Sequence, residues 1–212
     1  MNNTANLLLL LVVMLNFFIL GSSRLGSNIR TIAIQGGMLS LLPVLAHGFS
    51  NHTVFLAVAA FLLKGIAIPY LLFRAVRQVH IGREIQPLFG YVPTLILGTL
   101  ATAASFIFSD RLPLVAEHNL SLFVPVGLAT LATGFLLLIT RRKAINQVIG
   151  YLIFENGIFI FGMLLTEAMP LMVESGVLLD LLVAVFIMVI VMHQIKREFS
   201  TINIDQLTSL KE

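Results

Sequence analysis

One carboxylate lies in the middle of a hydrophobic segment that is long enough to cross a lipid bilayer. The segment is AINQVIGYLIFENGIFIFGMLL, and its charged side chain is Glu155. With a rise of 1.5 Å per residue and about ten residues on either side, a helical segment would place Glu155 roughly 15 Å deep. Inserting such a charge costs roughly 3 kcal/mol on insertion scales. We therefore interpret Glu155 as a functional group that faces a bundle interior or a wet cavity.

Lys64 and Asp180 repeat this pattern in two other hydrophobic segments. Lys64 is central in TVFLAVAAFLLKGIAIPYLLFR, and Pro69 follows five residues later. The missing N–H of Pro69 releases a backbone carbonyl beside the lysine, which suits a wet cavity. Ionisable residues inside membrane spans mark ion pathways and proton relays. We hypothesise that Glu155, Lys64 and Asp180 contribute to a path for protons or ions.

Each of these residues also has a structural interpretation, which the sequence leaves open. Glu155 could be a protonated acid that hydrogen-bonds across helices, for example to Asn156. Lys64 could form a static ion pair with Glu155 or with Asp180. Asp180 could serve only to bond one helix to another. The sequence does not show whether the three ionisable groups meet in space.

The composition predicts an all-α integral membrane protein. Of the 212 residues, 58% are hydrophobic and 11% are charged, whereas soluble domains carry about 25% charged residues. The chain has no cysteine, which excludes disulfides, thiolate metal sites and iron–sulfur clusters held by this chain. No zinc-ligand, nucleotide-binding or catalytic-triad pattern is present. We therefore predict no catalytic, cofactor-binding or metal-binding residue in this chain.

The hydropathy pattern predicts about seven transmembrane helices, each of about 20 apolar residues. The hydrophobic N-terminal stretch has no basic residue before it, so we expect a retained first span rather than a cleaved signal peptide. The polar cluster from His47 to His52 separates the second span from the third. The predicted spans are 5–22, 29–49, 53–76, 90–109, 121–140, 144–166 and 173–195.

The basic residues predict the orientation of these spans. Of the 13 lysines and arginines, Lys64 lies inside a span and Arg111 lies in a loop on one side. The others all fall in the odd-numbered loops and the tail. By the positive-inside rule, those loops and the C-terminus are cytoplasmic and the N-terminus is outside. The residues on the predicted cytoplasmic side are Arg24, Arg30, Arg74, Arg77, Arg83, Arg141, Arg142, Lys143, Lys196, Arg197 and Lys211.

Several sequence words resemble the hydrogenase-4 component E family. They are Gly150-Tyr151, Glu155-Asn156-Gly157, the acid at Asp180 and the ending Leu207-Thr208-x-Leu210-Lys211. Lys64 followed by Pro69 also fits, so the resemblance extends over most of the chain. Members of this family are membrane subunits of formate hydrogenlyase and related group 4 energy-converting NiFe hydrogenase complexes.

The last third of the chain, from about residue 121, is also similar to the three-span K-type subunit of respiratory complex I and to the C subunit of cation/proton antiporters. In that comparison the complex I carboxylates fall at Leu152 and Ala184, whereas this chain has Glu155 and Asp180. Each acid is displaced by about one helical turn, which keeps a side chain on the same face. The similarity divides the chain into a four-helix segment (1–120), a K-like three-helix segment (121–195) and a cytoplasmic tail (196–212).

The resemblance implies a non-catalytic subunit of a multisubunit oxidoreductase in the inner (cytoplasmic) membrane. Its implied partners are large antiporter-like membrane subunits, a complex I-like membrane anchor subunit and a peripheral redox arm. The partners, rather than this chain, would carry the NiFe and iron–sulfur centres. This chain would then contribute a polar path for proton or sodium translocation. The alternatives are a purely structural subunit of that complex and a cation/proton antiporter subunit.

Overall fold

The structure is a computed structural model that describes residues 3–79, 90–111, 122–141 and 144–165, and they are mostly helical. No β-strand occurs within these ranges. Among the described residues, five stretches are long and apolar enough to cross a membrane: Thr4–Gly21, Thr53–Arg74, Tyr91–Ser109, Phe123–Thr140 and Ile145–Met163. The elements are α1 (Asn3–Gly21), α2 (Leu25–Leu39), α3 (Leu42–His47), α4 (Asn51–Ala60), the π-helical η1 (Phe61–Ala67), α5 (Ile68–Val79), α6 (Tyr91–Ser109), α7 (Phe123–Thr140) and α8 (Ala144–Leu165).

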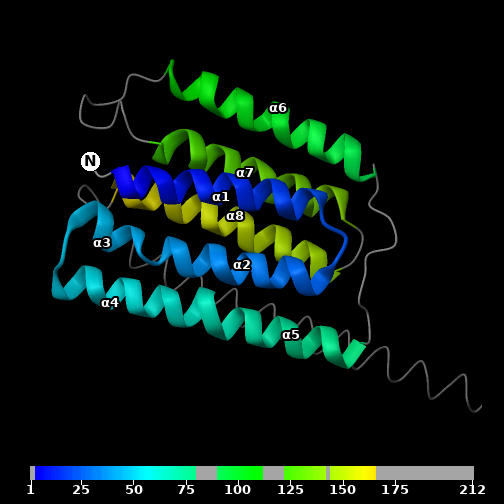
Figure 1. Ribbon diagram of the computed structural model, residues 1–212, viewed down its shortest axis with the longest axis horizontal. Helices are drawn as coiled ribbons and strands as arrows, with labels where there is room; N and C mark the ends of the chain where they lie inside the picture. The colour runs from blue at the N-terminus through cyan, green and yellow to red at the C-terminus, as the bar shows by residue number, and fades with distance from the viewer. Residues whose placement is uncertain (1–2, 80–89, 112–121, 142–143, 166–212) are drawn as a thin grey trace, which may run out of the picture.

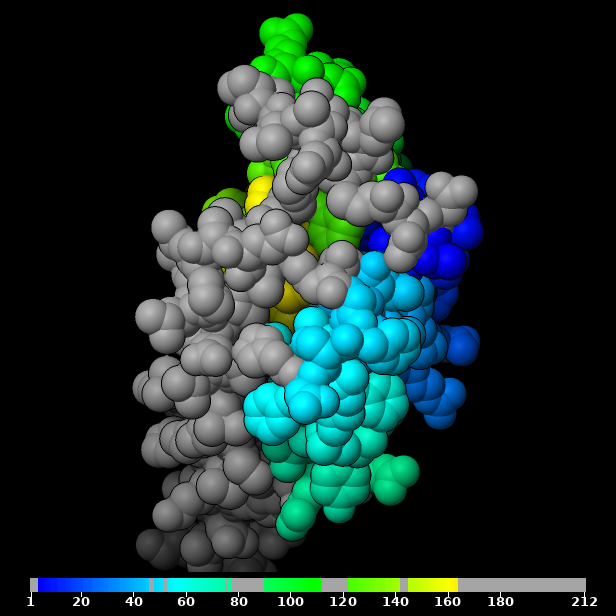
Figure 2. Space-filling view, turned by 90° about the vertical axis from the view of Figure 1, so that its left-hand side faces the viewer, coloured from blue at the N-terminus to red at the C-terminus, as the bar shows by residue number. Residues whose placement is uncertain are grey.

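These helices lie side by side and alternate in direction (Figure 1). α1, the α4–η1–α5 segment and α7 run one way, and α2–α3, α6 and α8 run the other way. α7 packs against α8, α1 and α6, whereas η1 and α5 pack against α2. Figure 2 looks along the bundle from the end that carries α3 and the start of α4, and it shows α6 at one outer margin.

The alternation places most of the described basic residues at one end of the bundle, which we call the basic end (Figure 1). This agrees with the predicted one-sided distribution, and the side of the membrane that this end faces stays a prediction. Arg111 follows α6 at the opposite end. The described residues at the basic end are Arg24, Arg30, Arg74, Arg77 and Arg141.

The predicted second span, 29–49, begins four residues earlier than expected and is divided into α2 and α3. The division falls at Ser40 and Leu41. Pro43 lies at the start of α3, and without an N–H it cannot bond to a carbonyl four residues earlier. In the turn before the proline, the Ser40 hydroxyl donates to the carbonyl of Gly37 at 2.7 Å. Neither helix is a candidate span by itself, although together they follow the length of the bundle (Figure 1).

The turn between the second and third predicted spans lies in the polar cluster, as predicted. Gly48 has a φ of 76°, a conformation that favours glycine. Ser50 then begins α4 with a capping box. Its hydroxyl accepts from the Thr53 N–H at 3.1 Å, and the Thr53 hydroxyl accepts from the Ser50 N–H at 2.9 Å. These bonds satisfy two backbone donors at the helix start.

The fourth, fifth and sixth predicted spans are confirmed within one or two residues by α6, α7 and α8. The predicted seventh span, 173–195, lies outside the described residues, as does the tail. The integral-membrane, all-α character is therefore supported, and the count of seven is a prediction that the described residues do not test.

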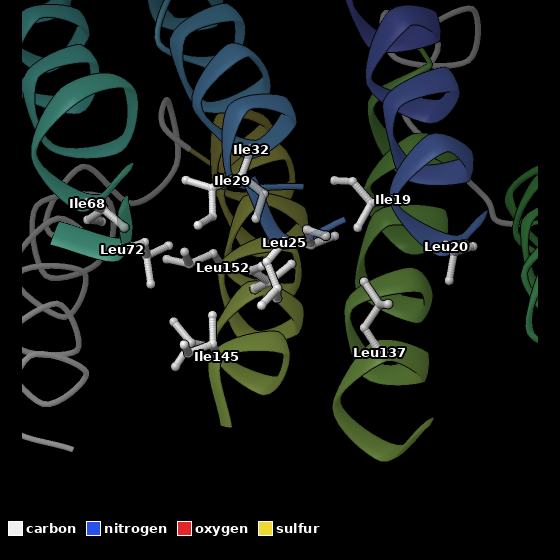
Figure 3. Packing of buried hydrophobic residues seen from close by; sticks show 13 residues of the cluster. Ile19, Leu20, Leu25, Ile29, Ile32, Ile68, Leu72, Leu137, Ile145 and Leu152 are labelled. Carbon is white, nitrogen blue, oxygen red and sulfur yellow. The ribbon is translucent and has the colours of Figure 1, made fainter. Parts of the chain in front are cut away.

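Two apolar clusters lie in the described part of the bundle, one toward each end. The first cluster lies toward the basic end and includes Ile19, Ile29, Leu72, Leu137 and Leu152 (Figure 3). The second cluster lies toward the other end and includes Leu9, Leu39, Leu56, Phe123 and Ile160.

Small residues bring α7 and α8 close together, as is common where helices pack within a membrane. A Cβ atom at Gly150 would lie 2.9 Å from the backbone nitrogen of Leu138, and one at Gly157 would lie 2.7 Å from that of Leu131. A Cβ atom at Gly134 would meet the backbone of Phe154. Since backbone atoms cannot move aside as a flexible side chain can, these glycines determine the distance between the two helices.

We expect Gly134→Ala to lower the free energy of unfolding by about 1–3 kcal/mol, the usual cost of overpacking. Gly21→Ala is the matched control, because a Cβ atom there would lie 3.5 Å from the flexible side chain of Leu95. The measurement is the unfolding midpoint of each purified variant in a detergent titration. Equal midpoints for the two variants would contradict the close approach of α7 and α8.

Candidate functional site

Lys64 lies at the centre of a helical distortion. The segment Thr53–Arg74 is one of the candidate spans, and within it η1 forms a π-helix from Phe61 to Ala67. The backbone N–H of Ile68 bonds to the carbonyl of Leu63, five residues earlier, ahead of Pro69. The predicted irregularity beside Lys64 is therefore present. Single π-helical turns often occur at functional sites.

Lys64 and Glu155 form an ion pair inside the bundle. The distance from Lys64 Nζ to Glu155 Oε1 is 2.8 Å, and the two side chains are 6% and 7% exposed. Glu155 lies near the middle of the 22-residue α8. The structure thus brings together two of the three predicted site residues, and the partner of Glu155 comes from a different span. The third, Asp180, lies outside the described residues.

The ring of Phe159 adds a second contact to the ammonium group. Lys64 Nζ lies 4.7 Å from the centroid of this ring, which is a cation–π distance. Glu155 and Phe159 are four residues apart on α8 and therefore share one face of the helix. Phe159 therefore contacts the lysine of η1. One face of α8 thus provides both a carboxylate and an aromatic ring for Lys64.

The backbone of α2 approaches Lys64 closely at Gly36. A Cβ atom at Gly36 would lie 2.8 Å from the Cβ of Lys64 and 3.0 Å from its carbonyl oxygen. Any larger residue would displace η1 from α2. Gly36 therefore positions the lysine relative to α8 as well as packing two helices together.

A chain of neutral polar side chains connects three other helices, and sequence reasoning missed it. The Gln35 side-chain amide donates to Asn16 Oδ1 at 3.0 Å, and the Asn16 amide donates to Thr130 Oγ1 at 2.9 Å. These three residues are at most 3% exposed. The available signal was the pair of amides within the apolar runs LNFF and IAIQGG.

These residues and the ion pair share one depth in the bundle, between the two apolar clusters. On α1, for example, Leu9 belongs to the second cluster and Ile19 to the first, with Asn16 between them. On α8, Leu152 belongs to the first cluster and Ile160 to the second, with Glu155 between them. We call this set the polar layer, and its buried members are Asn16, Gln35, Lys64, Thr130, Glu155 and Asn156.

Arg141 follows the last residue of α7, in the loop where it was predicted, but it is not exposed there. It was counted among the basic residues of a loop, yet its side chain is only 2% exposed. Its Nη2 donates to the carbonyl of Leu20 at 2.9 Å, and its guanidinium lies 4.8 Å from the centroid of the Tyr91 ring. A cation at the last carbonyls of a helix is favourable. Arg141 therefore links the end of α1, the start of α6 and the end of α7.

The polar layer has the chemical groups that an ion path requires. A carboxylate can accept and release a proton or provide oxygen ligands to a cation. The neighbouring ammonium offsets the cost of burying that carboxylate. The amide and hydroxyl groups can bond to water or to one another.

The sequence is similar to known proteins over most of its length. An uncharacterized protein of Mycobacterium tuberculosis is 28% identical over 204 residues, which cover 95% of this chain and 93% of that protein. Hydrogenase-4 component E of Escherichia coli is 26% identical over 175 residues, which cover 82% of this chain and 81% of that protein. The protein of the same name in Shigella flexneri matches equally. No family model and no solved structure matches. These similarities support the resemblance to hydrogenase-4 component E, whereas the similarity to the K-type subunit stays a prediction.

A double-substitution cycle tests the Lys64–Glu155 pair. We expect Lys64→Met and Glu155→Gln each to lower stability by roughly 3–5 kcal/mol, because each removes one of two buried opposite charges that lie in direct contact. The double variant Lys64→Met/Glu155→Gln should be more stable than either single variant. The measurement is the detergent unfolding midpoint of all four proteins. Strictly additive losses would show that the two side chains do not interact.

Proposed function

We propose that this chain is a membrane-arm subunit of a hydrogenase-like oxidoreductase complex of the formate hydrogenlyase type. The similarity to hydrogenase-4 component E and the apolar helices support a membrane subunit of such a complex. The single observation that carries the proposed role is the Lys64–Glu155 pair, which lies within two candidate spans. Charged residues at such depth are costly and typically functional.

In this proposal the subunit contributes a buried polar path along which protons or sodium ions move. Glu155 is the group that takes up and releases the ion. The ammonium group of Lys64 balances the negative charge of the Glu155 carboxylate. Asp180, in the predicted seventh span, is a further member of the path. The movement is coupled to redox chemistry elsewhere in the complex, so the chain itself carries out no redox step.

The proposed partners follow from the same resemblance. They are large antiporter-like membrane subunits, a complex I-like membrane anchor subunit and a peripheral arm that carries NiFe and iron–sulfur centres. The proposed location is the cell inner (cytoplasmic) membrane, with the basic end on the cytoplasmic side by the positive-inside rule.

A second candidate function is a purely structural subunit of the same complex. The short distance within the ion pair favours this structural role. A 2.8 Å contact between Lys64 of η1 and Glu155 of α8 can hold two spans together without moving any ion. The two functions differ in their response when both charges are removed, because a structural pair can often be replaced by neutral side chains.

We expect Glu155→Gln to lower ion translocation per redox turnover at least tenfold, the scale of about 1.4 kcal/mol in an activation barrier. The loss should persist in Lys64→Met/Glu155→Gln, which lacks both charges of this pair. The measurement is ion uptake by proteoliposomes that contain the intact complex, normalised to the amount assembled. Full coupling in the double variant would instead support the structural role.

Copurification in a gentle detergent from native membranes tests the proposed assembly. We expect large multi-span partners together with nickel and iron, identified by mass spectrometry and metal analysis. Large multi-span partners without these metals would indicate a cation/proton antiporter assembly. An isolated chain would contradict both.

A further inference from the structure

Four exposed arginines lie close to where two neighbouring helices reach the basic end. Arg24 directly precedes α2 and Arg30 lies in its second turn, whereas Arg74 and Arg77 lie in the last two turns of α5. α2 packs against α5, and the two run in opposite directions (Figure 1). Three of these arginines are therefore part of helices that face the membrane, so a role in loop orientation alone does not account for them.

The contact between α2 and α5 shows which edge of each helix carries an arginine. A Cβ atom at Gly26 would lie 3.9 Å from the ring of Phe73, and one at Gly37 would lie 3.4 Å from the ring of the first residue of η1. Arg30 is four residues after Gly26 and seven before Gly37, so it shares the edge of α2 that faces α5 and η1. Arg77 is four residues after Phe73 and likewise continues the edge of α5 that faces α2.

The opposite directions of the two helices bring these arginines together. Four residues span about 6 Å of helix, so Arg30 lies about 6 Å deeper than the Gly26–Phe73 contact and Arg77 about 6 Å further out. The Cα–Cβ bonds of a helix tilt toward its N-terminus. Arg30 on α2 therefore leans toward the basic end, whereas Arg74 and Arg77 on α5 lean toward the middle of the bundle. The long side chains converge near the level of the Gly26–Phe73 contact.

An exposed apolar stripe leads along η1 and α5 to this point. It consists of Leu62, Ile66 and Tyr70, which recur every four residues before Arg74 and share one helix face with it. Arg74 is ten residues beyond Lys64, or about 15 Å along a helix, which is half the thickness of the hydrocarbon core. The face thus changes from apolar to cationic at the depth where acyl chains give way to phosphate groups.

The described residues supply no acid to this cationic surface. Their acids are Asp110, at the end of α6, and Glu155, which contacts Lys64. Guanidinium groups bind phosphate through paired hydrogen bonds, and basic pockets between membrane helices bind anionic lipid headgroups. A phospholipid matches both the arginines and the apolar stripe, whereas an acidic protein surface would match the arginines alone.

We propose that Arg30, Arg74 and Arg77 form a binding site for an anionic phospholipid on the outer surface of α2 and α5. The guanidinium groups hold the phosphate and the anionic headgroup, and an acyl chain lies along the apolar stripe. This lipid site is on the outside of the bundle and does not depend on ion movement through the chain.

The experiment offers the purified full-length chain an equimolar mixture of phosphatidylglycerol and phosphatidylcholine with the same acyl chains. Native mass spectrometry counts the lipids that each protein retains. We expect the unmodified chain to prefer phosphatidylglycerol, and Arg30→Gln or Arg77→Gln to lower its retention about fivefold, the scale of one arginine near an anionic membrane. Arg111→Gln is the matched control, because it removes an exposed arginine at the opposite end and should retain the lipid normally.

The rise in the detergent unfolding midpoint on adding phosphatidylglycerol is a second measurement, since a ligand of the folded state stabilises it. We expect this rise in the unmodified chain and in Arg111→Gln, and a smaller one in Arg30→Gln. Equal retention of the two lipids by the unmodified chain would overturn the proposal without any variant. Equal losses in Arg30→Gln and Arg111→Gln would also overturn it, because net charge would then explain the binding. If Arg30→Gln and Arg77→Gln retain the lipid but lose multi-span partners, the surface docks an acidic protein instead.

Discussion

The ion pair between Lys64 and Glu155 is the interaction on which the rest of the bundle depends. Two charges in an apolar interior are tolerated only if each remains close to the other. That requirement brings the side chain of Lys64 on η1 to Glu155 on α8, near the middle of both candidate spans. It also requires α2 to admit the lysine backbone, which it does at Gly36 because no side chain intervenes. Three helical segments therefore adapt to Lys64: η1 forms a π-helical turn around it, Gly36 of α2 leaves room for its backbone, and Phe159 of α8 lies against its ammonium group.

The polar layer also provides what apolar packing alone cannot. Lipid tails are as apolar as leucine, so burial of leucine gives little preference for one helix register over another. Directional contacts do give such a preference, since sliding a helix by one turn breaks them. The bond between Asn16 and Gln35 aligns α1 with α2, and the bond between Asn16 and Thr130 aligns α1 with α7. The apolar clusters then pack above and below a layer whose depth is already determined.

Hydropathy located five of the predicted spans, because long apolar runs are visible in the sequence. Lys64 and Glu155 were visible as isolated ionisable groups within such runs. The pairing of Lys64 with Glu155 was one of several open alternatives, since it depends on how distant spans pack. The sequence did not predict a role for Asn16 and Gln35, because a neutral amide within an apolar run lowers its hydropathy less than a charge does. The division at Ser40 depends on the effect of Pro43 on the preceding turn, which hydropathy does not register. The loop position of Arg141 follows from the span bounds, but its burial does not, because it depends on contacts with the carbonyl of Leu20 and the ring of Tyr91.

The position of the acid on α8 has a physical reason in this bundle. In the predicted similarity to the K-type subunit, a carboxylate falls at Leu152, but here Leu152 belongs to the first apolar cluster. A carboxylate at that position would be surrounded by isoleucine and leucine, roughly one turn away from the level of Lys64. Moving the acid to Glu155 keeps it on nearly the same face and brings it to the depth of the ammonium group. The location of the lysine therefore determines where α8 can carry a charge. Lys64 and Glu155 therefore act as one unit in this layer. A mechanism from a related subunit applies to this chain only if the acid and the base lie at the same depth as each other.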